Sequence, residues 1–129
     1  MQQEKFKVIG YIRYLSYQFH ILSTNEACSS HLKDRQCSIP YLRVEIKNRI
    51  RNASYDLLEL AYEANTTEEV TAKISIINKC IAKAKIIDFL VNLSYEKQII
   101  NNKRYIKFGE SIDEIIKYLV GWKKSIKNQ

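Results

Sequence analysis

The stretch that decides the fold lies near the end of the chain and reads YIKFGESIDEIIKYLVGWKKSI at residues 105–126. Its large apolar residues recur at alternating spacings of four and three, a pattern that places them on one side of an α-helix. They are Phe108, Ile112, Ile115, Leu119, Trp122 and Ile126. A stripe of this length predicts a helix that turns one face toward a hydrophobic core.

Gly121 and Trp122 lie close to the end of this stretch. A glycine inside a helix costs about 1 kcal/mol relative to alanine. A close approach of two backbones, covered by the indole ring, would offset that cost. We therefore expect Gly121 and the only tryptophan to serve packing or subunit contact and not chemistry.

Three earlier segments show the same helical spacing, at about residues 4–22, 40–64 and 67–93, and the last helix should cover about 102–126. Each segment has its own apolar stripe. The predicted inner residues are Val8, Ile12, Leu15, Phe19 and Leu22, then Leu42, Ile46, Ile50, Ala53, Leu57, Leu60 and Ala64, then Val70, Ile74, Ile77, Ile81, Ala84 and Val91. Four long helices of this kind favour a helical bundle.

The connections between the helices are predicted to be short. Pro40 suits the first turn of the second helix, and Thr66 with Glu69 has the spacing of a capping box. One proline and three glycines are too few for a protein with many tight β-turns. We therefore predict one all-α domain over residues 1–129, an antiparallel up-down-up-down four-helix bundle.

The composition points to an anionic partner. The net charge is +7, and the predicted isoelectric point is about 9.3. Such a balance favours nucleic acid, and an anionic membrane less. No apolar run is long enough to span a membrane, and an N-terminus with Glu4 beside Lys5 and Lys7 does not fit a signal peptide, so we expect a cytoplasmic protein.

The positive charge is expected to gather at one end of the bundle. Basic residues spaced by four share a face of the second helix, and an antiparallel third helix should bring its own lysines to the same end. The predicted nucleic-acid-binding residues are Arg43, Lys47, Arg49, Arg51, Lys79, Lys83, Lys85, Lys103 and Arg104. The opposite end holds Asp56, Glu59, Glu63, Glu68 and Glu69. Phosphate contacts of this kind give salt-dependent affinity, whereas the alternative is a set of ordinary solvated charges.

The first helix has more apolar surface than its inner stripe uses. Tyr11, Tyr14 and Tyr17 flank that stripe. Tyrosine is common at interfaces because its ring packs while its hydroxyl stays hydrated. We expect these tyrosines to form a contact with another subunit, and Gly121 and Trp122 to serve either packing or such a contact.

A catalytic alternative rests on Arg13 and His20, which are separated by six residues and fit the Arg-x(4-6)-His pattern of HEPN ribonucleases. Such a pair binds phosphate and transfers a proton. Asp88 falls on the predicted inner stripe, where a carboxylate needs a partner, and we expect Arg13 or His20 to supply it. A structural pair is the simpler interpretation.

Cys28, His31 and Cys37 form a C-x2-H-x5-C cluster in the first loop. They would need a fourth ligand, such as Cys80, to hold zinc. An odd number of cysteines is not a disulfide framework, so free thiols are the expected state. We predict no metal and no cofactor.

The final helix resembles the accessory variability (Avd) proteins of diversity-generating retroelements. These belong to a four-helix-bundle superfamily that includes proteins encoded in intervening sequences of ribosomal RNA genes. The similarity extends over about residues 40–125 and is strongest in the last helix. The matching positions there are Tyr105, Glu114, Ile115, Lys117, Leu119, Gly121, Trp122, Lys124 and Ser125, and those in the second helix are Arg43, Ile50, Leu57, Leu58, Ala64 and Asn65.

The resemblance implies a homopentameric, barrel-like assembly of four-helix subunits. It also implies binding to a reverse transcriptase and to template RNA, or an RNA–DNA hybrid, during mutagenic synthesis of complementary DNA. It implies no catalysis by the chain itself. Two alternatives remain open from the residues, a stand-alone RNA-binding bundle of the intervening-sequence type and a HEPN-like ribonuclease.

Overall fold

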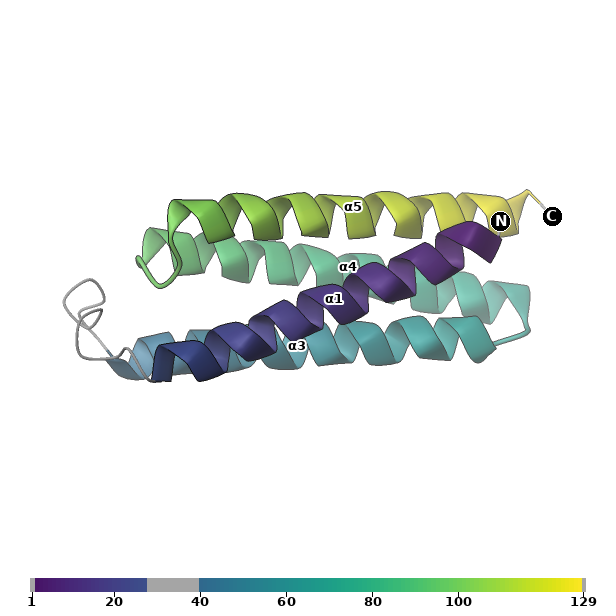
Figure 1. The fold of residues 1–129 in the computed structure, drawn as a ribbon. Coiled ribbons are helices and arrows are strands. Elements are labelled where there is room, and N and C mark those ends of the chain that lie inside the picture. Colours follow the sequence, from purple (N-terminus) through teal and green to yellow (C-terminus); the bar gives the residue numbers. More distant parts are fainter. Residues whose placement is uncertain (1, 28–39, 129) are drawn as a thin grey trace.

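The computed structural model describes residues 2–27 and 40–128, and these residues form a bundle of helices (Figure 1). The helices are α1 (Gln2–Ala27), α3 (Pro40–Thr66), α4 (Val70–Glu96) and α5 (Asn102–Lys127). The predicted all-α class is confirmed, and so is the place of each helix in the chain. The first helix is longer at both ends than its predicted range of 4–22.

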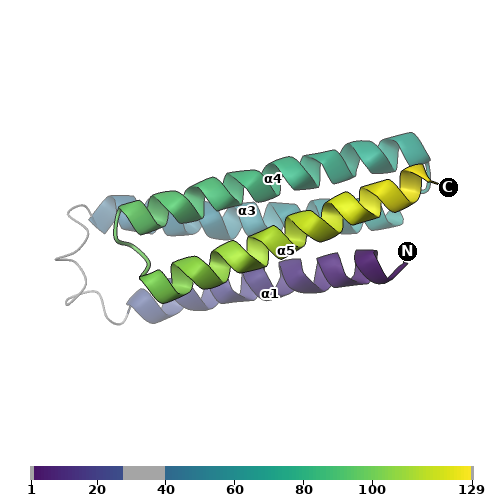
Figure 2. The same ribbon diagram turned by 90° about the horizontal axis from the view of Figure 1, so that it is seen from above.

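Neighbouring helices run in opposite directions (Figures 1 and 2). Helix α1 packs against α3 and α5, and α4 packs against the same two helices, so α1 and α4 lie on a diagonal. This is the up-down-up-down arrangement that short connections predict. The ends of α1 and α4 therefore lie at the same end of the bundle as the beginnings of α3 and α5.

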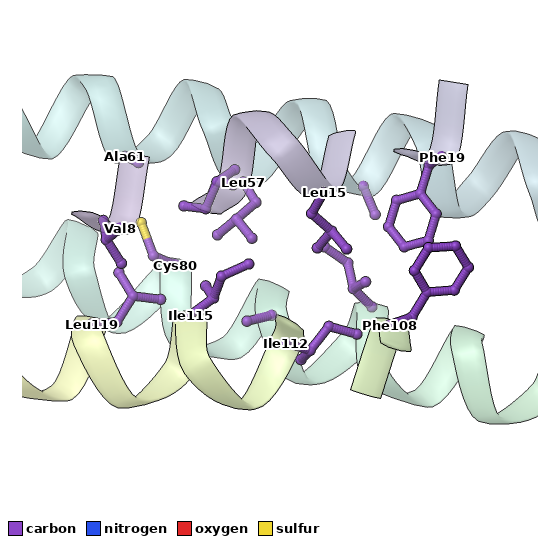
Figure 3. Close-up of a cluster of buried hydrophobic side chains, with 14 of the residues drawn as sticks. Val8, Leu15, Phe19, Leu57, Ala61, Cys80, Phe108, Ile112, Ile115 and Leu119 are labelled. Carbon is purple, nitrogen blue, oxygen red and sulfur yellow. The ribbon is translucent and has the colours of Figure 1, made fainter. Parts of the chain in front are cut away.

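One hydrophobic core runs along the axis of the bundle. The whole predicted stripe of α5 is buried, from Phe108 to Ile126, and so are the inner residues of α1 from Val8 to Phe19. Figure 3 shows the part of this core in which Val8, Leu15 and Phe19 of α1 meet side chains of the other helices. Near one end, the rings of Phe19 and Phe108 pack with their centroids 4.7 Å apart.

Helix α4 buries only half of its predicted inner stripe, namely Ile77, Ala84 and Val91. Val70 is 51% exposed, and Ile74 and Ile81 are only partly buried. The buried residues of α4 are Ile77, Cys80, Ala84, Ile87, Val91 and Ser94. Apolar residues occur on most sides of this helix, so their spacing alone leaves two neighbouring stripes nearly equivalent, and packing against α3 and α5 selects between them.

The turn between α3 and α4 does not contain the predicted capping box. Thr66 belongs to the last turn of α3, where its hydroxyl donates to the carbonyl of Glu63. Glu69 is instead the N-cap of α4, and its carboxylate accepts the backbone N–H groups of Thr71 and Ala72. These two hydrogen bonds lower the pKa of Glu69, because they favour the charged form.

The turn between α4 and α5 is shorter than predicted and closes the core. Gln98 adopts a φ of 60°, and the N–H of Ile99 donates to the carbonyl of Ser94, as in a Schellman helix end. Ile99 and Ile100 are buried. Asn101 then caps α5 by accepting the N–H of Arg104.

Candidate nucleic-acid interface

The ion pair between Lys83 and Asp56 defines the axial alignment of α3 and α4. Their Nζ and Oδ2 atoms are 3.8 Å apart. Asp56 lies thirteen residues after Arg43 in α3, a distance of about 20 Å along a helix. Lys79, Lys83 and Lys85 therefore lie toward the middle of the bundle and not at the end where α3 begins, so that part of the predicted basic site is wrong.

Positive side chains from two helices do converge at the end where α3 and α5 begin. Arg43 and Lys47 of α3 are only 6% and 9% exposed. Burial, and then the nearby guanidinium of Arg104 on α5, lower the pKa of Lys47 to about 8. This part of the predicted basic end thus comes together in three dimensions, with its α3 members more enclosed than ordinary surface cations.

Two further predicted residues of α3 are engaged locally. Arg49 lies 3.7 Å from Glu45, one turn earlier, and both side chains are well exposed. Arg51 donates to the side-chain oxygen of Asn48 at 3.2 Å. Exposed pairs one turn apart contribute only about 0.3–0.5 kcal/mol, so Arg49 is easily released to another anion.

A hollow with a cavity volume of about 340 Å³ lies beside the first turns of α5. Its lining residues are Gln18, Asn101, Lys103, Arg104, Lys107 and Phe108. Three of them are cations, and none is a carboxylate. The backbone N–H groups at the start of α5 add positive potential at this place. Gln18 and Lys107 were missed from the sequence, although Lys103 and Lys107 are four residues apart on one helix.

The predicted tyrosine surface of α1 is aromatic and basic together. Tyr11 and Tyr14 are 37% and 47% exposed, and Tyr17 is exposed still more. The ring of Tyr11 stacks on Tyr118 of α5 with a centroid distance of 5.5 Å. The Nζ atom of Lys107 lies 5.8 Å from the centroid of the Tyr14 ring. Cation–π contacts of this kind hold the lysine side chains against the aromatic surface.

Trp122 is a packing residue, as its position in the stripe predicts. Its side chain is 3% exposed, within the core between the helices. Gly121 beside it is half-buried in α5. The hydroxyl of Ser125 donates to the carbonyl of Trp122 at 2.8 Å within the same helix.

Arg13 and His20 are both exposed on α1. Asp88 was predicted to be buried and to pair with one of them. It is only partly buried, and Ile87 occupies the inner position of α4 instead. Burial, and then the carboxylate of Asp113 on α5, raise the pKa of Asp88. The predicted structural pair is therefore wrong, because α1 and α4 lie on a diagonal and Asp88 faces α5.

The cluster of Cys28, His31 and Cys37 lies outside the described residues. Cys80, its suggested fourth ligand, is fully buried and lies among the core residues of Figure 3. Burial, and then the carboxylate of Glu63, raise the pKa of this thiol to about 12. A thiol held protonated in this way acts as a small apolar group. Within residues 2–27 and 40–128, no three His, Cys, Asp or Glu side chains are grouped to hold a metal.

No helix in the described part of the chain has both the length and the apolar character needed to cross a membrane. Two features of the described residues bear on a polyanion partner, the cationic hollow at the start of α5 and the tyrosine surface of α1 beside it. Comparison of the chain with protein-family models, curated proteins and solved structures yields no match.

Proposed function

We propose that this chain is a noncatalytic nucleic-acid-binding protein that holds phosphate groups at the end of the bundle where α3 and α5 begin. The observation that carries the proposal is the hollow lined by Lys103, Arg104 and Lys107, with no carboxylate among the lining residues that the structure describes. Phosphate oxygens are the anions that Lys and Arg side chains bind in protein–nucleic acid complexes.

The electrostatics behind this hollow support the proposal. Arg104 lowers the pKa of Lys47, which means that two cations from different helices repel each other there. A phosphate brought between them would relieve this repulsion and favour the charged form of Lys47. Nucleic acid binding should therefore raise the pKa of Lys47 from its value of about 8.

We further propose that the protein works as a cytoplasmic accessory factor of a retroelement reverse transcriptase, bound to RNA or an RNA–DNA hybrid. The resemblance of the last helix to accessory variability proteins supports this assignment. Exposed apolar side chains on α4, chiefly Ile86 and Phe89, support contact with a protein, either another copy of the chain or the polymerase.

A charge-reversal experiment tests the phosphate site. Lys103→Glu with Lys107→Glu changes two exposed cations of the hollow, and Lys124→Glu with Lys127→Glu makes the same change of charge at the opposite end. We expect the first variant to bind RNA of unrelated sequences more weakly, with a salt dependence flatter by roughly 0.7–0.9 per lost phosphate contact. Fluorescence anisotropy at several salt concentrations measures both quantities.

The RNA affinity of the control variant should stay close to that of the wild-type protein, apart from a small decrease caused by its lower net charge. Equal losses in the two variants would mean that the whole positive molecule attracts RNA without a defined site. Co-purification with a reverse transcriptase encoded beside this chain tests the accessory role, and RNA binding without such a complex would favour the stand-alone alternative.

A further inference from the structure

A second hollow lies farther along the contact between α1 and α5, which lie next to each other in Figure 2 and converge toward the N-terminal end of α1 in Figure 1. Its cavity volume is about 380 Å³, and it is lined by Lys7, Gly10, Tyr11 and Tyr14. A Cβ atom at Gly10 would meet nothing within 4 Å, so open space lies beside this residue. The hollow thus combines exposed aromatic rings with a cation.

Lys107 joins this tyrosine hollow to the cationic hollow. It lines the cationic hollow, and its Nζ atom lies over the ring of Tyr14, which lines the tyrosine hollow. From Tyr11 to Gln18, α1 advances about 10 Å, close to three stacked nucleotides at about 3.4 Å each. Lys107 thus connects two separate hollows, and the two hollows together with this lysine are called the α1–α5 groove.

We propose that the α1–α5 groove binds single-stranded nucleic acid, with phosphates in the cationic hollow and unpaired bases stacked on Tyr11 and Tyr14. The inference rests on the proposed function and adds to it the strandedness of the ligand. Base stacking on aromatic rings needs bases whose faces are free, which a duplex does not offer. Stacking on these rings should also depend little on the base sequence, since every base has an aromatic face.

The charge of the groove favours a polyanion over a second copy of this chain as its occupant. The lysines of the groove lie against its rings, with Lys7 5.5 Å from the centroid of Tyr118 and Lys107 over Tyr14. A subunit interface would have to desolvate these ammonium groups, and lysine is depleted at the centres of interfaces. A nucleic acid strand instead matches them with its phosphates.

The test compares two pairs of exposed tyrosines. Tyr11→Leu with Tyr14→Leu removes the aromatic faces of the groove, while Tyr55→Leu with Tyr62→Leu removes two tyrosines of α3 that are each 43% exposed. Each protein is titrated with a labelled single-stranded RNA, with a duplex of equal length, and with a single strand in which abasic sites replace the bases. Anisotropy gives the dissociation constants, and light scattering gives the mass of each variant.

We expect the Tyr11/Tyr14 variant to bind the single strand at least about tenfold more weakly, since stacking contributes about 1–3 kcal/mol per base. Its binding to the duplex and to the abasic strand should remain close to wild type, as should every measurement on the Tyr55/Tyr62 variant. The wild-type protein should itself prefer the intact single strand to the abasic one.

Three results would overturn the inference. Unchanged single-strand binding by the Tyr11/Tyr14 variant, together with a loss in the Lys103/Lys107 variant, would remove the stacking site and leave the proposed function standing. A change of mass in the Tyr11/Tyr14 variant would show that the groove is a subunit interface. A wild-type protein that binds none of the three nucleic acids would contradict the proposed function as well.

Removing a single negative charge provides an independent test, in which the affinity for single-stranded nucleic acid should increase instead of decrease. Glu114 follows Lys107 by seven residues and so lies on the same side of α5. Glu114→Gln should strengthen single-strand binding a few-fold, because it removes repulsion of phosphate. The matched change Asp113→Asn, on an exposed carboxylate that lies near Asp88 of α4 and about 120° around the helix from Lys107, should have a smaller effect, and equal effects would count against the groove.

Discussion

Trp122 shows at the residue scale how one buried side chain ties α5 to the rest of the core. Its side chain is 3% exposed, so truncation leaves a cavity that the neighbouring helices fill only in part. Trp122→Ala should reduce the free energy of unfolding by about 3–5 kcal/mol. Urea unfolding followed by circular dichroism measures it.

Tyr62→Ala is the matched control for Trp122→Ala, since it truncates an aromatic ring that is 43% exposed. We expect a change of about 0.5 kcal/mol or less there. A loss below about 1 kcal/mol for Trp122→Ala would show that the indole contributes little to the core.

Lys47 should make stability depend on pH in a defined window. Its pKa is lowered from 10.5 to about 8 in the folded protein, by burial first and by Arg104 second. Between these two values the unfolded chain holds a proton that the folded chain has released, so stability rises with pH by up to about 1.4 kcal/mol per unit. Below pH 8 both states are protonated, and this contribution becomes constant.

The difference in unfolding free energy between the wild-type protein and Lys47→Met isolates this effect. It should rise in favour of the wild type from about pH 8 to 10.5 and be flat below pH 8. A difference that does not vary with pH would contradict the lowered pKa. Bound RNA should raise the lower limit of this window and leave its upper limit at 10.5, because phosphate raises the pKa of Lys47 only in the folded protein.

At the scale of the helices, the end of α4 contains a residue that the backbone does not favour. Gln98 has a φ of 60° at the position where glycine is common in a Schellman helix end. Gln98→Gly should raise the free energy of unfolding by about 1 kcal/mol, because it removes the clash of a Cβ atom in the left-handed region.

Gln98→Ala is the control for this change, since alanine keeps the Cβ atom and shortens the side chain. Thermal unfolding of the two variants and the wild type separates the backbone effect from the loss of the glutamine amide. A glycine variant no more stable than the alanine variant would contradict the positive φ at residue 98.

At the scale of the whole molecule, the exposed apolar side chains of α4 predict an assembly. Ile86 and Phe89 are 53% and 61% exposed, and isolated monomers rarely expose a large apolar patch. Light scattering should therefore give a mass near five times 15.2 kDa, the number of subunits that the resemblance implies, unchanged by salt. Phe89→Lys should dissociate the assembly, and Tyr55→Lys should leave it intact.

A monomeric wild-type protein at micromolar concentration would remove the assembly from the proposal. The apolar patch of α4 would then need another protein to cover it, and the reverse transcriptase would be the first partner to test. The α1–α5 groove, which includes the cationic hollow, lies within one chain. RNA binding by the monomer would therefore still test it.

The sequence by itself determined the helices, the bundle topology, the inner faces of α1 and α5, and the excess of positive charge. These features depend on interactions within each helix, since the spacing of residues such as Phe108 and Leu119 determines which side of a helix is apolar. Short connections then force neighbouring helices to be antiparallel. The apolar residues of α4 form two nearly equal stripes, so their pattern correctly predicted Ile77, Ala84 and Val91 as buried but wrongly added Val70, Ile74 and Ile81.

Only the tertiary structure decided how far each helix is shifted along its neighbours. Helical spacing contains no information on this axial alignment, which placed Lys83 beside Asp56 and moved three predicted lysines away from the basic end. The same alignment brought Lys107 against Tyr14 and Arg104 near Lys47. Packing of side chains from several helices sets these contacts, so the groove and the hollow emerge only when the four helices are assembled.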